Sequence, residues 1–388
     1  MRQIDVESAK EKFGKLLESE AARIERMRNT GPAPDFSVVS PIIVGVIPGD
    51  GIGPIIMEQT LRVLRELIGD RIEKGTVDLR IIKGLSIDER VEKMQTLPLE
   101  ALNALKECHV ILKGPMTTPR PGDPWPYLPS AVAGIRRELE LNVSLRPVVN
   151  PVKKIDWVMF RENIEGAYIW GSKGIQVDDD LAVDFVVETK LQSLHVARMA
   201  FEYARKNGRH HVTAVTKVNI VKLTDGNLLA ACREIAKEYP EIVYDERLVD
   251  ITASKLTDPE FTSDLEVLVL PNLYGDIISD IAAEISGGVS TAGSANIGSR
   301  YALFEAIHGT APFLTKNNRG EYADPSSLLK AMGMMLAHIG FTEEARRLEK
   351  AMEICGYTER KVTVTSFPED ASTREYTDYI LETLAQID

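Results

Sequence analysis

Short apolar runs alternate with helical stretches over most of this 388-residue chain, and that alternation narrows the folds it can adopt. Buried strands are expected at 42–47, 77–82, 110–112, 155–160, 212–215, 265–270 and 302–307. Between them lie helical patterns such as 193–206 and 224–238. Parallel strands need helical crossovers of this kind, so the sequence predicts an α/β fold with a substantially parallel sheet.

The length suggests more than one domain, because a single compact core rarely extends to 388 residues. Two domains, or one large α/β unit with an insertion, both fit. Residues 6–27 form an amphipathic helical pattern, and the Gly-Pro-Ala-Pro segment at 31–34 separates it from the main body. Two proline-rich passages, 115–129 and 147–151, are expected to mark a lip and a domain crossing.

Composition excludes several classes of function. The net charge of −12 opposes a general nucleic-acid or membrane-surface role, since either needs a basic face. No apolar run approaches the roughly 20 residues that span a bilayer. The N-terminus is charged and lacks an apolar signal core, which predicts a cytoplasmic protein. Three scattered cysteines predict buried free thiols rather than disulfides or a zinc site.

Two aspartates, Asp276 and Asp280, lie four residues apart in an apolar, helix-compatible run. This spacing places both on one helix face, where like charges destabilise an isolated helix by roughly 0.2–0.5 kcal/mol. Hard oxygen ligands without a nearby Cys or His cluster favour Mg²⁺ or Mn²⁺. The alternative is a solvated helix start whose acids favour the positive end of the helix dipole.

A glycine-rich turn at 48–54 follows a predicted strand and opens a helix. The Rossmann fingerprint needs a third small residue and a later acidic residue, but Ile56 holds the third position and Pro54 intrudes. We therefore reject a Rossmann motif. A tight turn that brings backbone N–H groups to a ligand remains possible, as does an ordinary strand-to-helix turn.

Three arginines, Arg136, Arg146 and Arg161, stand in segments that otherwise have core-like patterns. Guanidinium groups suit bidentate recognition of carboxylates, although most arginines pair with a structural acid instead. Lys217 follows the 212–216 strand, where burial would lower the pKa of its ammonium group and suit it to acid–base work. Tyr168 lies just beyond the Arg161 strand end.

Together these segments resemble the decarboxylating β-hydroxyacid dehydrogenase family, which includes isocitrate and isopropylmalate dehydrogenases. The matching pieces occur in family order and extend over nearly everything after Pro41. They are Ile47 to Pro54, Lys113 to Pro119, Leu145 to Pro147, Phe160 to Asn163, Asn272 to Asp280, and His308 to Pro312.

The resemblance implies a two-domain fold unlike Rossmann. A large cofactor-binding domain would be made of both chain ends, 41–141 and 287–388, after an N-terminal helical extension at 1–40. A smaller central domain, 142–286, would carry substrate and metal residues and the dimer contacts. Members are usually homodimers whose active sites are completed across the interface.

The resemblance also implies a role for each matched residue. Substrate carboxylates would be bound by Lys113, Ser130, Arg136, Arg146 and Arg161. The catalytic pair would be Tyr168, the proton donor, and Lys217, the base supplied by the second subunit. The Mg²⁺ or Mn²⁺ ligands would be Asp250 from the second subunit, Asp276 and Asp280. Cofactor contacts would come from Ile52, Thr117, Thr118, His308, Gly309, Thr310, Ala311 and Asp324.

The implied reaction is metal-dependent oxidative decarboxylation of isocitrate to 2-oxoglutarate and CO₂, as in the tricarboxylic acid cycle. Isocitrate enzymes usually have Asn two residues after the serine, where this chain has Val132, and Trp125 makes the nearby lip apolar. Homoisocitrate, isopropylmalate and tartrate therefore stay open as substrates, as does a non-catalytic regulatory subunit of a heteromeric isocitrate dehydrogenase.

The resemblance favours NAD over NADP, because Asp370 stands near the place where NADP-dependent relatives bind the 2′-phosphate. Phe313 and Asp324 also depart from the residues that NAD enzymes usually carry. Lys316 and Arg319 lie in the same loop and are able to reach a phosphate.

Overall fold

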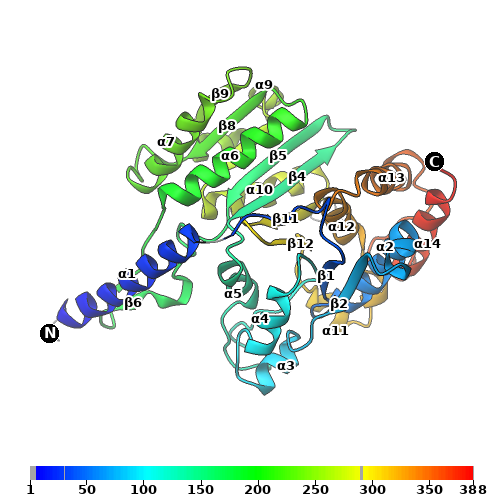
Figure 1. Cartoon of the computed structure of the whole chain (residues 1–388), viewed down its shortest axis with the longest axis horizontal. Helices are drawn as coiled ribbons and strands as arrows, with labels where there is room; N and C mark the ends of the chain where they lie inside the picture. Colours follow the sequence, from blue (N-terminus) through cyan, green and yellow to red (C-terminus); the bar gives the residue numbers. More distant parts are fainter. Residues whose placement is uncertain (1–5, 30, 289–291, 388) are drawn as a thin grey trace. The chain divides into compact units, whose positions relative to one another are not determined.

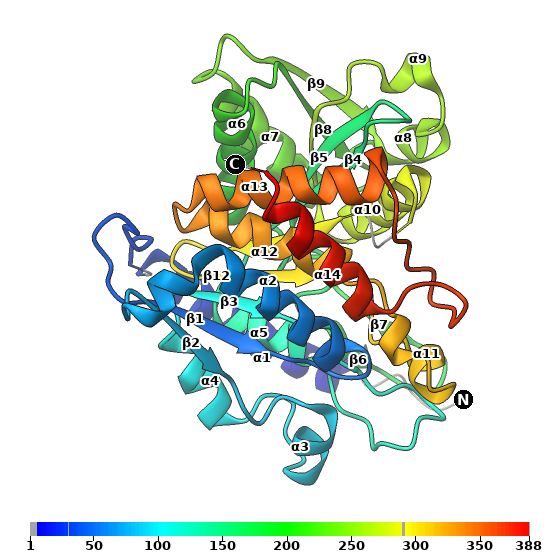
Figure 2. The same ribbon diagram turned by 90° about the vertical axis from the view of Figure 1, so that its right-hand side faces the viewer.

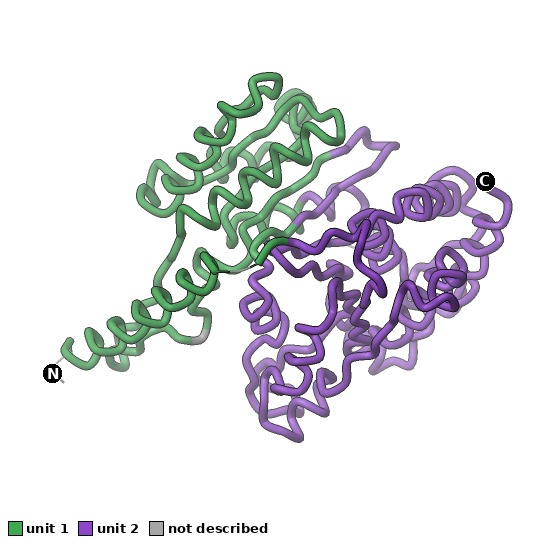
Figure 3. Tube along the Cα trace, in the orientation of Figure 1, with its two compact units in different colours: residues 1–32, 142–144, 157–281 green, residues 33–141, 145–156, 282–388 purple. Residues whose placement is uncertain are grey.

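The computed structural model describes residues 6–29, 31–288 and 292–387, which divide into two compact units. Unit 1 comprises residues 1–32, 142–144 and 157–281, and unit 2 comprises 33–141, 145–156 and 282–388 (Figure 3). Each unit combines a sheet with helices, which confirms the predicted α/β class (Figure 1). The domain boundaries given above stay predictions.

Unit 1 is built around four parallel strands in the order β5-β10-β8-β9. Helices α6 and α7 pack on each other and against β8. The elements of this unit are α1 (Val6–Arg28), β5 (Ile155–Glu162), η1 (Gly171–Lys173), β6 (Ile175–Gln176), β7 (Ala182–Val183), α6 (Lys190–Lys206), β8 (His211–Thr216), α7 (Thr224–Ala236), β9 (Val243–Leu248), α8 (Val249–Lys255), α9 (Pro259–Thr262), β10 (Val267–Leu270) and most of α10 (Asn272–Ser286).

Unit 2 contains five strands in the order β2-β1-β3-β12-β11, parallel except for β11 against β12. Helix α12 packs on β11 and β12, and α2, α13 and α14 gather around it (Figure 2). The elements are β1 (Ile42–Ile47), α2 (Gly53–Glu73), β2 (Val77–Ile81), α3 (Ile87–Glu92), α4 (Leu99–Lys106), β3 (Val110–Lys113), α5 (Ala131–Glu138), β11 (Gly293–Ile297), β12 (Ala302–Ala306), α11 (Pro312–Lys316), η3 (Gly320–Tyr322), α12 (Ser326–His338), α13 (Thr342–Glu353), η4 (Ile354–Thr358) and α14 (Thr373–Leu384). Strand β4 (Val143–Asn150) is divided between the units.

Local chemistry explains where several helices begin. Ser86 and Glu89 form a reciprocal capping box at the start of α3, a helix that the apolar pattern did not predict because it is only one and a half turns long. The second capping box, from Ser372 and Glu375, begins α14. In α6, Thr189 Oγ1 accepts a hydrogen bond from the backbone of Gln192.

The three cysteines, Cys108, Cys232 and Cys355, are buried free thiols, as predicted. Burial raises the pKa of the Cys108 thiol to about 11, so this thiol stays protonated and unreactive at neutral pH. Within the described residues, every helix is too short or too polar to cross a bilayer.

Candidate active site

Four of the predicted site residues follow the carboxyl ends of parallel strands in unit 1. Arg161 lies near the end of β5 and pairs with Leu270, the last residue of β10. Helix α10, which carries Asp276, begins shortly after Leu270. Thr216 at the end of β8 pairs with Leu248 of β9, which places Lys217 and Asp250 at the same edge. Because parallel strands end together, residues far apart in sequence gather along one edge.

Arg161 is the centre of this group and is only 1% exposed. Its Nε and Nη2 atoms donate to Asn272 Oδ1 over 3.1 and 2.6 Å, and its Nη1 atom donates to Asp276 Oδ1. A Cβ atom on Gly275 would lie 2.6 Å from Arg161 Cγ, so this turn of α10 has room for glycine alone. Backbone and side-chain contacts therefore fix the guanidinium in one orientation.

Tyr168 completes the Arg161 group from a loop. Its hydroxyl donates to Asp276 Oδ2 over 2.9 Å, and the Arg161 guanidinium lies 5.5 Å from the centre of its ring. The side chain is 40% exposed, so its hydroxyl is accessible for proton transfer. Asp276 is half-buried, whereas Asp280, one turn further along α10, is exposed.

Lys217 forms an ion pair with Asp250, whose Oδ1 atom lies 2.7 Å from Lys217 Nζ. Lys217 is half-buried, with 26% of its side chain exposed. The strand end carries the ammonium group out of the core and toward the acid on α8. The hydrogen bond from Lys217 lowers the pKa of the Asp250 carboxyl.

Asp250, Asp276 and Asp280 are not clustered tightly enough within the described chain to hold one ion. The tightest group of potential ligands there is His211, Asp245 and Asp264. Arg247 donates to Asp245 over 2.9 Å and to Asp264 over 2.7 Å. The guanidinium of Arg247 pairs with both acids, so the group forms an ion-pair network.

A second charged cluster lies in unit 2, where Glu305 of β12 stands in register with Lys113 of β3. Glu305 accepts from Arg136 over 2.9 Å and from Asn296 over 2.8 Å, and Lys113 Nζ lies 2.8 Å from its other oxygen. Burial alone would raise the pKa of Glu305, but the charges of Lys113 and Arg136 hold it well below its usual range.

Sequence reasoning missed Glu305, although one signal was present. Glu305 lies within the apolar strand Ala302 to Ala306, and an acid that is buried in such a strand needs a cation as partner. Arg136 keeps one buried donor, Nε, without a hydrogen-bond partner in the described structure. The cluster therefore fixes two of the predicted substrate-binding cations against one buried acid.

The two other predicted substrate residues of unit 2 lie on α5 and β4. Ser130 is the N-cap of α5, and its hydroxyl accepts from the backbone N–H of Ala133 over 3.3 Å. Arg146 is buried in β4.

Three loops that carry predicted cofactor residues meet in unit 2. Ile52 N–H donates to Thr310 O over 3.2 Å, and Asp50 N–H donates to Pro115 O over 2.7 Å. The Asp50 carboxylate in turn accepts from Thr117 N–H over 2.7 Å. We call segments 48–53, 114–117 and 308–311 the loop cluster. The turn expected at 48–54 thus packs against backbone from two other loops.

Of the other cofactor candidates, His308 and Ala311 belong to the loop cluster, whereas Thr118 and Asp324 lie outside it. His308 Nδ1 lies 3.0 Å from Gly309 O, and burial lowers the pKa of the His308 ring. Ala311 adopts a left-handed conformation with φ of 47°, and Thr118 is exposed. Asp324 accepts from the backbone N–H of Ser326 over 2.8 Å.

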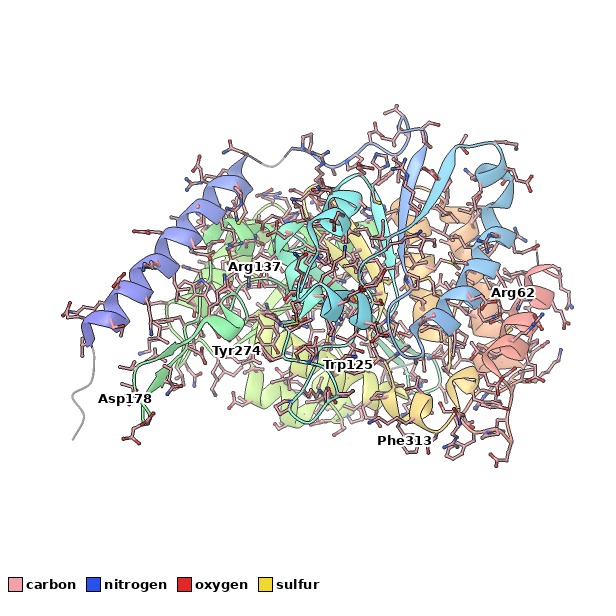
Figure 4. All side chains as sticks on the ribbon, turned by 90° about the horizontal axis from the view of Figure 1, so that it is seen from below. Arg62, Trp125, Arg137, Asp178, Tyr274 and Phe313 are labelled. Carbon is pink, nitrogen blue, oxygen red and sulfur yellow. The ribbon has the colours of Figure 1, made fainter. Side chains whose placement is uncertain are left out.

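Helix α11 and the 365–370 segment form an adjoining surface of unit 2. Phe313 projects from α11 with 65% of its surface exposed (Figure 4). The Arg319 guanidinium lies 4.1 Å above the Phe367 ring. Thr365 donates a short hydrogen bond to Asp370. This surface therefore presents the Arg319 guanidinium and the exposed carboxylates of Glu369 and Asp370 near exposed aromatic rings.

Comparison with known proteins decides the family. Residues 43–380 match the family described as isocitrate/isopropylmalate dehydrogenase. The chain belongs to this family. The resemblance and fold inferred from the motifs are therefore confirmed.

Individual members of the isocitrate/isopropylmalate dehydrogenase family differ in their described roles. Isocitrate dehydrogenase [NADP] of Rickettsia typhi is 36% identical over 87% of this chain and 69% of its own length. A mitochondrial regulatory subunit of isocitrate dehydrogenase [NAD] from Dictyostelium discoideum is 36% identical over 88% of this chain and 92% of its own. The crystal structure of isocitrate dehydrogenase from Methylococcus capsulatus superposes with a TM-score of 0.77 at 33% identity, over 88% and 99% of the two chains.

Proposed function

We propose that this chain catalyses the metal-dependent oxidative decarboxylation of isocitrate with NAD as the hydride acceptor. The observation that carries the proposal is the arrangement of Arg161, Asp276 and Tyr168. A guanidinium fixed by Asn272, a carboxylate and an accessible phenol meet within hydrogen-bonding distance. The reaction needs a cationic group that binds the substrate carboxylates, a carboxylate that binds the metal ion, and a proton donor.

Each residue has a task that follows from its chemistry. Arg161 and Arg136 would bind substrate carboxylates through their guanidinium groups, and Lys113 would add a third cation. Lys217 would first lose a proton to solvent, and its neutral amine would then accept the proton of the substrate hydroxyl, while its partner Asp250 orients the side chain. Tyr168 would give its hydroxyl proton to the carbon from which CO₂ has left.

The acids of α10 fit a divalent cation by the nature of their donors. Asp276 and Asp280 offer hard oxygen atoms one helical turn apart, and neither belongs to a Cys or His group. A bound Mg²⁺ or Mn²⁺ would polarise the oxygen of the keto acid and favour loss of CO₂. Asp250 would serve as a further ligand if a neighbouring protomer brought it to this place.

Cofactor choice depends on the surface formed by α11 and the 365–370 segment. Asp370 carries a negative charge that would repel the 2′-phosphate of NADP, and this supports NAD. Arg319, which is held over Phe367, and Lys316 of α11 are the cations discussed above that would favour NADP. We assign NAD because a carboxylate near a phosphate opposes binding, whereas the stacked guanidinium is already engaged.

The test is reduction of nicotinamide by the purified protein with Mn²⁺. Isocitrate, homoisocitrate, isopropylmalate and tartrate are each offered with NAD and with NADP. The proposal requires the highest kcat/KM with isocitrate and NAD, loss of turnover with EDTA, and recovery with Mn²⁺ or Mg²⁺. Preference for another acid would indicate that Val132 and the apolar segment around Trp125 determine substrate specificity. Turnover that resists EDTA would contradict the metal site.

A regulatory role is the second candidate, favoured by the similarity to the regulatory protein of Dictyostelium discoideum. In that case the chain would bind ligands without turnover. The presence of Tyr168, Lys217 and both α10 acids supports catalysis, because a binding module has no need for a proton donor and a base. Turnover that the Asp280→Asn substitution abolishes would exclude a contaminating enzyme and the regulatory role together.

We also propose that the active unit is a homodimer with shared sites. Apolar side chains near the Lys217–Asp250 pair are exposed in the single chain: Ile220 is 70% exposed, Leu223 86% and Ile251 45%. Their burial against a second copy would remove apolar surface from water.

A further inference from the structure

The N-terminal helix α1 lies outside the family match, which begins at residue 43, yet it contributes to the interior of unit 1. Phe13 stacks on Phe185 with ring centres 4.7 Å apart and meets Trp170 edge-on at 6.4 Å. Further along the same helix, Arg23 is 2% exposed. Helix α1 therefore packs into unit 1 with a buried charged side chain, which needs partners within that unit.

Arg23 reaches a group of buried acids. Its guanidinium forms a short ion pair with Glu165 and a second ion pair with Glu20 of the same helix. Glu162 and Glu165 are fully buried, and Glu188 is 8% exposed. Burial raises the pKa of Glu165, and the charge of Arg23 opposes that rise. Arg23 thus supplies the positive charge that makes an ionised Glu165 tolerable there.

Glu165 also holds the residue that orients Arg161. Its peptide oxygen accepts from Asn272 Nδ2 over 2.8 Å, and Asn272 Oδ1 is the acceptor for two donors of Arg161. The Glu165 carboxylate accepts from Thr189 N–H over 2.6 Å and from its hydroxyl over 2.8 Å. The chain of contacts therefore leads from α1 through Glu165 and Asn272 to Arg161.

The packing around this chain of contacts leaves little freedom. Gly166 has φ of 69°, and a Cβ atom there would lie 3.0 Å from Asn272 Cβ. The Glu162 carboxylate accepts from Ile164 N–H over 3.0 Å and from Glu165 N–H over 2.6 Å, so the 162–166 turn is fixed at both ends. Displacement of the Glu165 side chain would move the backbone that anchors Asn272.

We propose that Arg23 of the N-terminal helix is a positioning residue for the site. By holding the Glu165 carboxylate it fixes the peptide oxygen that anchors Asn272, and so sets the direction of Arg161 toward Asp276. The identity of the ligand rests on the proposed function, but the mechanical coupling does not. Helix α1 thereby contributes to the orientation of Arg161, although the family match does not include this helix.

The test compares full-length variants R23M, R23K, R23M/E165Q and R28M. The matched control is R28M, because Arg28 lies on the same helix in an exposed ion pair with Glu25. Two measurements are made well below the melting temperature: KM for isocitrate and for the cofactor, and hydrogen exchange of peptides that contain residues 272–280. A residue that only stabilises the fold would change both KM values or neither.

We expect R23M to raise KM for isocitrate by about tenfold or more, the range seen when a supporting residue is lost, with KM for the cofactor within about twofold. Exchange in 272–280 should accelerate, and R28M should match the wild type. R23M/E165Q removes both charges and also the contact that holds residue 165, so it should show the same selective rise in KM for isocitrate as R23M. Unchanged KM and exchange in folded R23M, or wild-type values in the double variant, would overturn the proposal.

Should R23M not fold, R23K keeps the charge but loses the fork that joins Glu20 to Glu165. It should raise KM for isocitrate selectively, and wild-type values in both measurements would refute the coupling. If the wild-type protein turns over none of the four acids, the proposed function fails. The exchange comparison still decides whether Arg23 controls the 272–280 segment.

Discussion

Asn272 Oδ1 accepts two hydrogen bonds from Arg161, from Nε over 3.1 Å and from Nη2 over 2.6 Å. The amide therefore fixes the plane of the guanidinium, while the third nitrogen, Nη1, faces Asp276. An arginine held in this way has its direction set before a ligand arrives, and less entropy is lost when a carboxylate binds.

Replacement of Arg161 by lysine should abolish this fixed orientation while the positive charge remains. A lysine ammonium cannot present the planar fork that Asn272 accepts. We expect kcat/KM for isocitrate to fall by about 100-fold or more, equivalent to roughly 3 kcal/mol, with a smaller change in KM for the cofactor. Steady-state kinetics with each substrate varied in turn measures the split, and an equal loss in both would point to general damage.

Substitution of Gly275 by alanine should disturb the same guanidinium from the other side. The new Cβ would lie 2.6 Å from Arg161 Cγ, and the arginine is too well anchored to withdraw. Unfolding in urea should show a loss of roughly 1–3 kcal/mol, the usual cost of overpacking.

The matched control is Gly226→Ala in α7, where the added Cβ would meet nothing within 4 Å apart from its chain neighbours and the backbone of its own helix. This substitution should stabilise by about 0.5–1 kcal/mol, because alanine favours a helix more than glycine does. Equal effects of the two substitutions would disprove the steric argument.

The buried acid Glu162 predicts a pH dependence of stability. Burial, together with the charge of Glu165, raises the pKa of Glu162 to about 8, from about 4.3 in an unfolded chain. At pH values between these two pKa values, Glu162 keeps its proton in the folded protein but has lost it in the unfolded chain. Stability from this group is therefore complete below about pH 4 and is lost as the pH rises through 8.

Glu162→Gln should remove this part of the slope, which amounts to at most about 1.4 kcal/mol per pH unit for one proton. Urea unfolding at pH 5, 6, 7 and 8 gives the difference between variant and wild type. The control is Glu18→Gln at an exposed position of α1. Identical slopes in wild type and Glu162→Gln would show that Glu162 ionises normally in the folded protein.

Mixing two inactive variants tests the proposal of shared sites. Lys217→Met and Asp280→Asn would damage opposite halves of each site, so a mixed dimer would contain one intact site. Random exchange of subunits should restore about a quarter of wild-type activity. Asp276→Asn mixed with Asp280→Asn damages the same half and should remain inactive. No recovery in the first mixture would place both halves in one subunit.

Site residues at the ends of strands could be predicted from the sequence, whereas the residues with which they form ion pairs and hydrogen bonds could not. Arg161 and Lys217 were recognisable because each follows a buried apolar strand. Arg23 was not, because it is one of many charged residues on an amphipathic helix and its partner Glu165 lies 142 residues away. Such long-range ion pairs depend on tertiary packing, which local patterns do not encode.

The backbone contacts of the loop cluster limit which of its residues can be substituted. A Cβ on Gly49 would lie 2.1 Å from Pro115 O, one on Gly114 would lie 2.1 Å from Pro48 O, and one on Gly51 would lie 2.3 Å from Thr310 O. No substitution at these glycines leaves the three backbones in place. A change of cofactor preference in this chain would therefore have to come from side chains outside the cluster, such as Phe313, Arg319 and Asp370 on the surface that we propose contacts the cofactor.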